Sequence, residues 1–372
     1  MQVKPTMENL LIGFTSFTLG QAAMMLIGGV LLYLAIAREY EPMLLLPIGF
    51  GCIMANIPFS AAVGEDGPLT LLYQYGILTE LFPLLIFIAI GAMIDFGILL
   101  KNPKMFLFGG AAQFGIFFTI TVATLLGFDM KESASIGIIG AADGPTSIYV
   151  ATKFAPRLLA PISVAAYTYM SLVPIIQPPV IRALTTLEER KIRMPYHEAG
   201  ISKTVKILFP ILITVIAGIV APVSVALVGF LMFGNLLREC GVTERLGKAA
   251  QNELANLVTI LLGITIGSTM VAETFLRWDT LMIIALGLVA FIGDTAGGVL
   301  FAKLLNLFTK EKINPMVGAA GISAFPMSAR VIHQEAQRAD PANFLLNHSI
   351  SANVAGQIGS IIAGGLILAL VK

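Results

Sequence analysis

The residues best suited to chemistry lie between positions 140 and 146, where polar and helix-breaking residues interrupt an apolar run. Asp143 brings a carboxylate, Gly144 and Pro145 disturb a helix, and Thr146 adds a hydroxyl. A charge at the middle of a bilayer costs on the order of 3 kcal/mol. Lipid offers no hydrogen-bond partner, so backbone that opens at membrane depth must line a protein cavity or bind something. The stretch therefore predicts an ion site on a discontinuous helix.

A second interrupted segment covers residues 313–330. Two prolines bracket a Gly-rich apolar centre, and the polar groups are Asn314, Ser323, Ser328 and Arg330. Small cations such as Na⁺ prefer several hard oxygen ligands, which amides, hydroxyls, carboxylates and open backbone carbonyls supply. We expect Ser323 to belong to the site and Ser328 to serve helix packing, as small residues commonly do in membranes.

Arg330 carries the opposite charge. Its guanidinium suits a carboxylate or a carboxylated substrate, although an arginine at the end of a segment also reaches the interface without any such partner. Tyr167 and Tyr169 could each bind an ion or donate a proton, and their spacing does not choose between chemistry and packing. Asp294, Asn353 and other buried polar residues are weaker candidates.

Composition defines the class of protein that must position these groups. The chain has 372 residues, of which 57% are hydrophobic and 12% charged, and its mean hydropathy is +0.88. These values predict a polytopic membrane protein. The 23 Lys and Arg nearly balance the 22 Asp and Glu, so nothing indicates binding to nucleic acid. The sequence has no nucleotide-binding P-loop, dinucleotide fingerprint or zinc motif, so ATP bound by this chain does not drive transport.

Ten apolar runs are long enough, or nearly long enough, to span a bilayer. They are Leu19–Ala37, Met43–Ile57, Phe82–Leu100, Met105–Gly127, Leu158–Leu184, Ile207–Val220, Val223–Leu237, Leu254–Met270, Thr280–Leu300 and Phe344–Val371. An interrupted segment lies between the fourth and fifth run of each set of five. The expected domains are a first membrane repeat (1–184), a basic cytoplasmic loop (185–206) and a second membrane repeat (207–372).

The two sets resemble one another. Gly49-Phe50 reappears as Gly229-Phe230, Ile90-Gly91 as Ile266-Gly267, and Gly140-Ala141-Ala142 as Gly318-Ala319-Ala320. The order is kept and the separation stays near 176 to 180 residues. This pattern predicts an internal duplication.

Loop charges predict the orientation. The basic stretch 182–206 belongs in the cytoplasm by the positive-inside rule, and the acidic stretch 64–67 then falls outside, with Lys153 and Arg157 as exceptions. Each half has five crossings, an odd number, so the repeats should be inverted. We expect an all-α fold in which the two interrupted, re-entrant segments come from opposite faces and meet near the midplane, as in a transporter.

Three elements together resemble the β subunit of the biotin-dependent, sodium-translocating decarboxylases, the family of the oxaloacetate, methylmalonyl-CoA and glutaconyl-CoA decarboxylase pumps. They are residues 140–146, the run from Tyr167 to Pro179 with its Gln177-Pro178-Pro179 motif, and residues 314–330. The resemblance covers nearly the whole chain. It implies a multi-pass protein of the bacterial cytoplasmic membrane that decarboxylates carboxybiotin, consumes a proton and moves Na⁺ outward.

The resemblance also assigns roles to residues and implies partners. Asp143 matches the sodium-site carboxylate, and Tyr169 matches a tyrosine of ion binding or proton delivery. Asn314, Gly318 and Ser323 match further functional positions of the sodium site, Ser323 as a sodium or proton ligand with a catalytic role, and Arg330 matches the catalytic contact for the carboxylate. Ala141 stands where many relatives have a second Gly. The implied partners are biotin-carrier and carboxyltransferase subunits, which present carboxybiotin without a covalent link to this chain, a small membrane subunit, lipid and further copies of the chain.

A secondary sodium-coupled symporter or exchanger without enzymatic activity is the main alternative, since it would share the broken helices. Consumption of a carboxylated biotin separates the two. The compact chain favours the acyl-CoA pumps over the oxaloacetate enzyme, but substrate choice belongs to another subunit.

Overall fold

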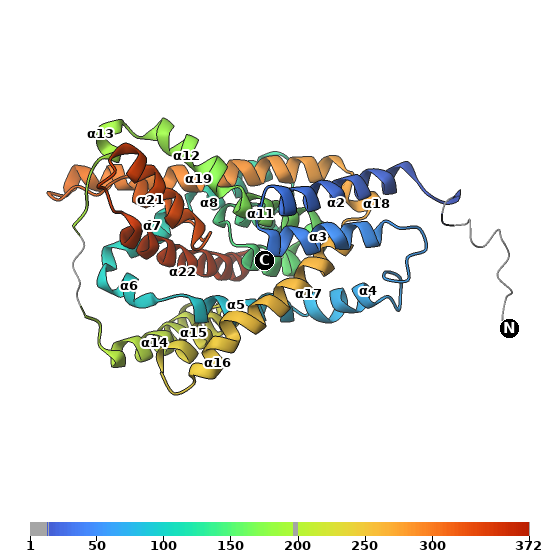
Figure 1. Cartoon of the computed structure of the whole chain (residues 1–372), viewed down its shortest axis with the longest axis horizontal. Helices are drawn as coiled ribbons and strands as arrows, with labels where there is room; N and C mark the ends of the chain where they lie inside the picture. The colour runs from blue at the N-terminus through green and yellow to red at the C-terminus, as the bar shows by residue number, and fades with distance from the viewer. Residues whose placement is uncertain (1–12, 14, 196–199, 372) are drawn as a thin grey trace. The chain divides into compact units, whose positions relative to one another are not determined.

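A computed structural model describes residues 13, 15–195 and 200–371 of the chain, and every regular element in these residues is a helix (Figure 1). Seven of the described helices are long and apolar enough to span a membrane, and the number rises to nine if each of two bent pairs is one span. The predicted all-α, polytopic membrane fold is thus confirmed. Residues 196–199 of the predicted basic loop lie outside the described residues.

The chain forms two compact units, and each of them draws on both predicted halves. The first consists of residues 1–82 and 256–281, and the second of residues 83–255 and 282–372. The first unit holds α2 (Leu19–Ala37), α3 (Pro42–Ala55), α4 (Pro68–Leu72), the π-helix η1 (Tyr73–Ile77), most of α17 (Ala255–Ser268) and α18 (Ala272–Phe275).

The second unit contains the rest of the chain, including most of the helices Leu81–Met93 and Trp278–Phe308. Its first helices are α5 (Leu81–Met93), α6 (Phe96–Lys101), η2 (Pro103–Met105), α7 (Phe106–Ala111), α8 (Phe114–Leu125), α9 (Met130–Gly137), η3 (Ile138–Ala141), α10 (Gly144–Phe154), η4 (Pro156–Leu158), α11 (Leu159–Ser171), α12 (Val173–Leu184) and α13 (Leu187–Arg190). After these come α14 (Lys203–Val220), η5 (Pro222–Ser224), α15 (Val225–Glu239), α16 (Glu244–Ala249), η6 (Ala250–Leu254), α19 (Trp278–Phe308), α20 (Met316–Ala319), α21 (Met327–Ala339) and α22 (Leu346–Leu370).

Two predicted spans are interrupted in the structure. The run Phe82–Leu100 divides into α5 and α6 at Asp95, because this carboxylate accepts a hydrogen bond from Gly97 N at 2.8 Å and begins a new helix. The run Leu158–Leu184 is bent by 68° between α11 and α12. A side-chain cap sets the first break, whereas the second lies at Leu172, where no side chain caps α12 and Pro174 occupies its first turn.

The two units repeat one packing motif. In the first unit α17 approaches α3 so closely that a Cβ on Gly267 would lie 2.1 Å from the carbonyl oxygen of Ile48. In the second unit α5 approaches α15, and a Cβ on Gly91 would lie 1.8 Å from the carbonyl oxygen of Leu231. Gly91 and Gly267 are matched residues of the predicted duplication, and π-helices η1 and η6 precede both of their helices. The motif supports the duplication, while the inversion of the repeats stays a prediction.

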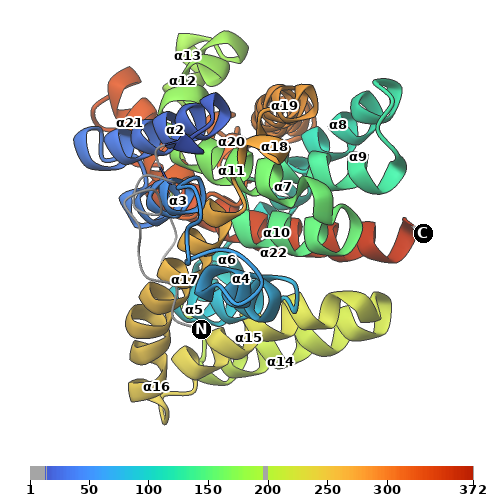
Figure 2. The ribbon, with the colours of Figure 1, turned by 90° about the vertical axis from the view of Figure 1, so that its right-hand side faces the viewer.

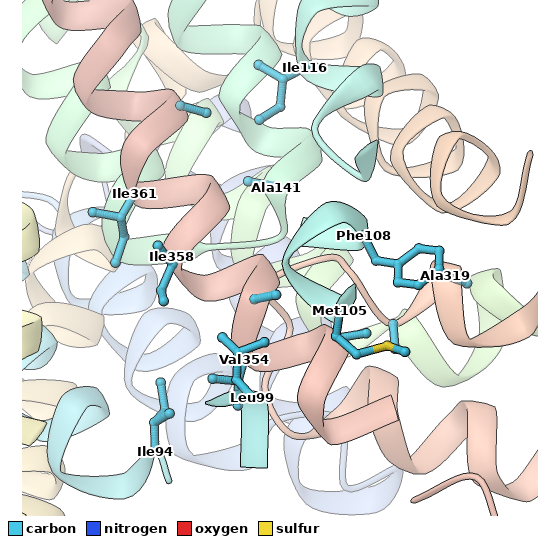
Figure 3. Packing of buried hydrophobic residues seen from close by; sticks show 14 of the residues in the cluster. Ile94, Leu99, Met105, Phe108, Ile116, Ala141, Ala319, Val354, Ile358 and Ile361 are labelled. Atoms are coloured by element: carbon cyan, nitrogen blue, oxygen red, sulfur yellow. The ribbon is translucent and has the colours of Figure 1, made fainter. Parts of the chain in front are cut away.

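Helix α22 forms the centre of the second unit. Its buried Val354, Ile358 and Ile361 belong to the same apolar cluster as Ala141 of the first interrupted segment and Ala319 of the second (Figure 3). Lipid is as apolar as these side chains, so close packing between helices, more than removal from water, stabilises the arrangement. At the edge of this unit α14 and α15 lie side by side (Figure 2).

The two basic residues that depart from the charge pattern both have local partners. Arg157 forms an ion pair with Glu132, and the ammonium of Lys153 lies 5.4 Å from the centre of the Tyr149 ring. Both side chains are therefore held by contacts within the fold.

Candidate functional site

The first interrupted segment opens at Ala142 and Asp143. Helix α9 continues into the 3₁₀ turn η3, Ala142 adopts a left-handed conformation with φ of 51°, and Asp143 is extended. The predicted breakers Gly144 and Pro145 instead begin α10. Proline fits the first turn of a helix, where no intrahelical acceptor awaits its missing N–H. The break therefore lies one residue earlier than these two residues suggest.

Asp143 is the N-cap of α10 and is 3% exposed. Its Oδ1 accepts a hydrogen bond from Thr146 N at 3.3 Å, and its Oδ2 accepts from Thr146 Oγ1 at 2.7 Å and from Ser360 Oγ at 2.9 Å. The partial positive charge of the helix N-terminus also favours an anion here. No Lys, Arg or His in the described part of the chain pairs with this carboxylate. The site thus presents a buried carboxylate held by neutral donors, without a protein counter-charge.

The second interrupted segment contacts the first at this point. After α20 the chain is irregular from Ala320 to Pro326, and within this stretch Ser323 N donates to the carbonyl oxygen of Ala141 at 2.9 Å. Ser323 Oγ donates to the carbonyl oxygen of Gly356 at 2.9 Å. The expected meeting of the two segments is therefore present, two residues from Asp143.

One face of α22 links the two breaks. Asn353 Nδ2 donates to the carbonyl oxygen of Ala320 at 3.2 Å and also to that of Ile322, and Gln357 Nε2 donates to that of Ser323. Ser360, less than one turn further on, donates to Asp143 as described above. Side chains four and three residues apart share one helix face. One helix thus binds both irregular segments through side chains on the same face.

Gln177 fixes the second segment from the other side. Its Nε2 donates to the carbonyl oxygen of Ala319 at 2.8 Å and to Ser328 Oγ at 2.9 Å, while its Oε1 lies 3.0 Å from the same hydroxyl. This residue begins the Gln-Pro-Pro motif on α12. The motif therefore stabilises open backbone, and Ser328 takes part in that polar clamp.

An ion pair flanks the clamp on α21. Arg182 Nε and Nη2 each donate to the Glu335 carboxylate at 2.8 Å, and Arg338 also contacts it. Burial by itself would raise the pKa of Glu335, but the hydrogen bonds and charges of Arg182 and Arg338 outweigh it and lower the pKa. The charge pair joins α12 to α21 just beyond the second break.

Gly318 and Asn314 have contacts of their own in the structure. Gly318 touches Gly298 of α19, and a Cβ on Gly318 would lie 2.0 Å from the Gly298 carbonyl oxygen. Asn314 Nδ2 donates to the carbonyl oxygens of Arg190 and Ile192, each at 2.9 Å, and thereby joins the start of the second segment to the basic loop. Neither residue forms a hydrogen bond with Asp143.

The two tyrosines differ in their surroundings. Tyr169 donates a hydrogen bond to the carbonyl oxygen of Ile284 on α19, whereas the buried hydroxyl of Tyr167 has no hydrogen-bond partner in the described residues. The Tyr167 ring packs against Gly144, where a Cβ would lie 2.2 Å from a ring carbon. The residue after Asp143 must accordingly be a glycine, and the free hydroxyl belongs to Tyr167.

Arg330 and Asp294 lie apart from the Asp143 hydrogen bonds. Arg330, on the first turn of α21, is exposed and makes no ion pair with any residue that the structure describes. Asp294 Oδ1 accepts a hydrogen bond from Ile116 N at 3.1 Å, at the start of α8. Its Oδ2 is buried without a partner, beside Gly140 of the first break.

Sequence reasoning left out Ser360 and Gln357. Their signal is the spacing of Asn353, Gln357 and Ser360 at intervals of four and three on α22, whose residues beyond Ser360 are all apolar or Gly. Such a stripe predicts a polar face, but not what that face contacts.

These features define a class: a polytopic membrane protein with two broken helical segments joined beside a buried, uncompensated carboxylate. The groups around this carboxylate are hydroxyl and carboxylate oxygens, which are hard ligands. Residues 20–371 match the family described as the Na⁺-transporting oxaloacetate decarboxylase beta subunit. The chain belongs to this family.

Individual relatives agree with the family match. The chain is 54% identical to the methylmalonyl-CoA decarboxylase subunit beta of Veillonella parvula over 97% of this chain and 95% of the relative. It is 53% identical to the glutaconyl-CoA decarboxylase subunit beta of Acidaminococcus fermentans over 96% and 95%. It is 44% identical to a probable oxaloacetate decarboxylase beta chain of Vibrio cholerae over 97% and 99%.

Proposed function

We propose that this chain is the membrane subunit of a sodium-pumping decarboxylase of the bacterial cytoplasmic membrane, which decarboxylates carboxybiotin and couples that reaction to outward Na⁺ transport. The observation that carries the proposal is the buried Asp143 carboxylate, which lies where two open backbone segments meet and pairs with no cationic side chain among the described residues. A bound Na⁺ would supply the missing positive charge. Family membership gives the chemistry and does not favour a symporter without enzymatic activity.

The proposed Na⁺ ligands surround the first break. Asp143 supplies the charge, and the hydroxyls of Ser360, Thr146 and Ser323 can turn a lone pair toward a cation. That Asn314 and Gly318 also bind Na⁺ stays a prediction, for which their contacts with the loop and with α19 give no support.

The proposed reaction breaks the bond between the carboxylate carbon and the ureido nitrogen of carboxybiotin. Carbon dioxide leaves, the electron pair stays on nitrogen, and one proton is taken up there. The exposed, unpaired Arg330 can hold the carboxylate with its planar fork. Exclusion of water favours this reaction, so the proposal requires that the exposed Arg330 is shielded from water when the substrate is bound.

Delivery of the proton falls to one of the two tyrosines. Tyr169 can fill the role that the family resemblance implies only if its hydroxyl leaves the Ile284 carbonyl during turnover. Tyr167 has a free hydroxyl beside the first break. We propose that biotin-carrier and carboxyltransferase subunits present the substrate from the cytoplasm and that a small membrane subunit completes the complex, with more than one copy of this chain.

The substrate of the partner subunit is proposed to be an acyl-CoA. The acyl-CoA relatives are 53% and 54% identical and align over 359 and 360 residues. The oxaloacetate relative at 44% needs 429 aligned positions, so it differs by insertions.

Decarboxylation of free N-carboxybiotin by the purified membrane complex, in NaCl and in KCl of equal ionic strength, tests the function. We expect stimulation by Na⁺ that Asp143→Asn abolishes. An ion pair at 4 Å is worth about 4 kcal/mol at an effective dielectric constant of 20, or roughly a thousandfold in Na⁺ affinity. Turnover that is equal in both salts would contradict sodium coupling. Na⁺ binding without any turnover would instead support the symporter.

A further inference from the structure

A cavity of about 590 Å³ lined by several lysines lies in the second unit, and its lining shares no residue with the Asp143 hydrogen bonds. It opens between the end of α6 with η2 and the C-terminal end of α19. Four lysines and one glutamate line it, namely Lys101, Lys104, Lys310, Lys312 and Glu311. Such an excess of positive charge around one cavity favours an anionic ligand.

The lysines have few partners within the protein. Lys312 Nζ donates to the carbonyl oxygens of Asn306 and Thr309 and so caps the end of α19. Lys101, Lys104 and Lys310 make no ion pair or hydrogen bond with any residue that the structure describes. Three ammonium groups therefore remain available to a ligand.

A buried donor points to the same kind of ligand. Asn102 also lines the cavity, and its Nδ2 is buried without an acceptor among the described residues. An amide donor left without an acceptor costs about 1–3 kcal/mol. An anion that brings several acceptor oxygens into the cavity would satisfy this donor and the three ammonium groups together.

The position of the cavity relative to the apolar spans indicates which type of anion it binds. The apolar span Pro103–Leu125 begins at its wall, and the span Trp278–Phe308 ends immediately before Thr309. The cavity is thus at the level of lipid headgroups, on the side that the charge pattern assigns to the cytoplasm. Basic pockets between membrane helices at this level bind anionic headgroups.

The rest of the lining suits the remainder of a lipid molecule. Pro103, Met105, Met194 and Ile313 add apolar surface next to the lysines. A free phosphate has no use for such surface, whereas the glycerol and upper acyl carbons of a phospholipid would cover it. We propose that this cavity binds the headgroup of an anionic phospholipid. Because Ile313 directly precedes Asn314, the bound lipid would also support the start of the second interrupted segment.

The test measures binding of phosphatidylglycerol and of phosphatidylcholine with identical acyl chains to the purified full-length protein by native mass spectrometry. The test variant is Lys104→Gln/Lys310→Gln, in which both altered lysines are exposed. The control is Lys131→Gln/Lys248→Gln, which removes two charges outside the cavity. Each lysine near a membrane surface contributes about fivefold to the affinity for an anionic lipid. We therefore expect the test variant to bind phosphatidylglycerol roughly 25-fold more weakly and the control to bind it normally.

Three results would overturn the proposal. Equal binding of the two lipids by the wild-type protein would show that the headgroup charge is not recognised. Equal weakening in the control variant would show a general effect of protein charge. Displacement of the lipid by inorganic phosphate at equal concentration would assign the cavity to a soluble anion. Thermal unfolding of both variants verifies that the fold is kept.

Discussion

The two interrupted segments meet through one hydrogen bond, yet they are built from different chemistry. The first contains a carboxylate that caps its own following helix and receives hydroxyl donors from Thr146 and Ser360. The second has no charge at the junction, and the amides of Asn353, Gln357 and Gln177 bind its open carbonyls. Amide side chains do not titrate. If one of them moved away from the carbonyl that it binds, a buried hydrogen-bonding group would be left without a partner, which costs free energy. The first segment is thus suited to binding and releasing a cation, and the second to keeping the surrounding backbone in a fixed conformation.

A carboxylate introduced at the second interrupted segment should have the largest effect on stability. Gln357→Glu has nearly the same shape, but its ionised carboxylate faces the Ser323 carbonyl oxygen that the amide now binds. A buried charge without a partner destabilises a protein by about 3–5 kcal/mol. We expect a large fall in the thermal unfolding temperature of the purified protein in detergent.

Asp143→Asn is the matched control for that experiment, because it makes the reverse exchange. It removes a buried charge and keeps the shape, so its unfolding temperature should stay close to that of the wild-type protein. If Gln357→Glu is also as stable as the wild type, the amide does not clamp the second segment and the contrast between the two segments fails.

Ser360→Ala should weaken Na⁺ binding at the first segment. The variant loses a hydroxyl 2.9 Å from Asp143 Oδ2, and hydrogen bonds to charged groups contribute about 1.5–3 kcal/mol. We expect the Na⁺ concentration for half-maximal decarboxylation to rise about tenfold or more. Ser351→Ala is the control, because this buried serine on the same helix bonds the Ile98 carbonyl instead. If this Na⁺ concentration rises equally in both variants, Ser360 is not a Na⁺ ligand.

Replacing Tyr169 by phenylalanine should mainly affect stability, whereas replacing Tyr167 should mainly affect turnover. Tyr169→Phe loses the hydrogen bond to Ile284 and should cost about 0.5–1.5 kcal/mol of stability, whereas Tyr167→Phe loses no bond and should leave stability unchanged. We expect Tyr167→Phe to lower the rate of carboxybiotin turnover in the complex. If Tyr167→Phe is fully active and Tyr169→Phe is stable but inactive, Tyr169 and not Tyr167 delivers the proton.

The smallest effect concerns the ion pair beyond the second segment. The folded pKa of Glu335 lies below its ordinary value, so its stabilisation is complete above the unfolded pKa and is lost as the pH falls through the folded pKa. Arg182 is half exposed, which limits the contribution to about 1 kcal/mol. Glu335→Gln should therefore unfold at a lower temperature than the wild type at pH 7, and the difference should vanish well below pH 4. A difference that persists there would mean that packing, not charge, matters at this position.

Much of the fold could be predicted from the sequence, because a bilayer restricts what an apolar run can form. The predicted run Leu19–Ala37 coincides with α2, and the interrupted segments occur where Gly, Pro and polar residues enter apolar surroundings. The positions of the helix breaks were predicted less accurately. Hydropathy averages over many residues, whereas Asp95 and Asp143 begin new helices through single side-chain hydrogen bonds.

The candidate site was predictable only in part, because its partners come from distant positions in the chain. Asp143 and Ser323 stood out as polar residues in broken apolar segments, and the structure places them on either side of one junction. Ser360 lies 217 residues from Asp143 and gave only a weak periodic signal. Gln177, singled out by the resemblance, acquired a physical role only when Ala319 and Ser328 were found beside it.

The sequence by itself determined the kind of protein, the two segments that must open and the carboxylate at their centre, since composition and helix breakers act locally. The tertiary structure decided which carbonyls are held by amides, which tyrosine keeps a free hydroxyl and where lysines surround a cavity. These properties depend on contacts between residues that are 31 positions apart for Asn353 and Ile322 and 142 positions apart for Gln177 and Ala319. Helix packing determines such contacts, and no local pattern of residue types records them.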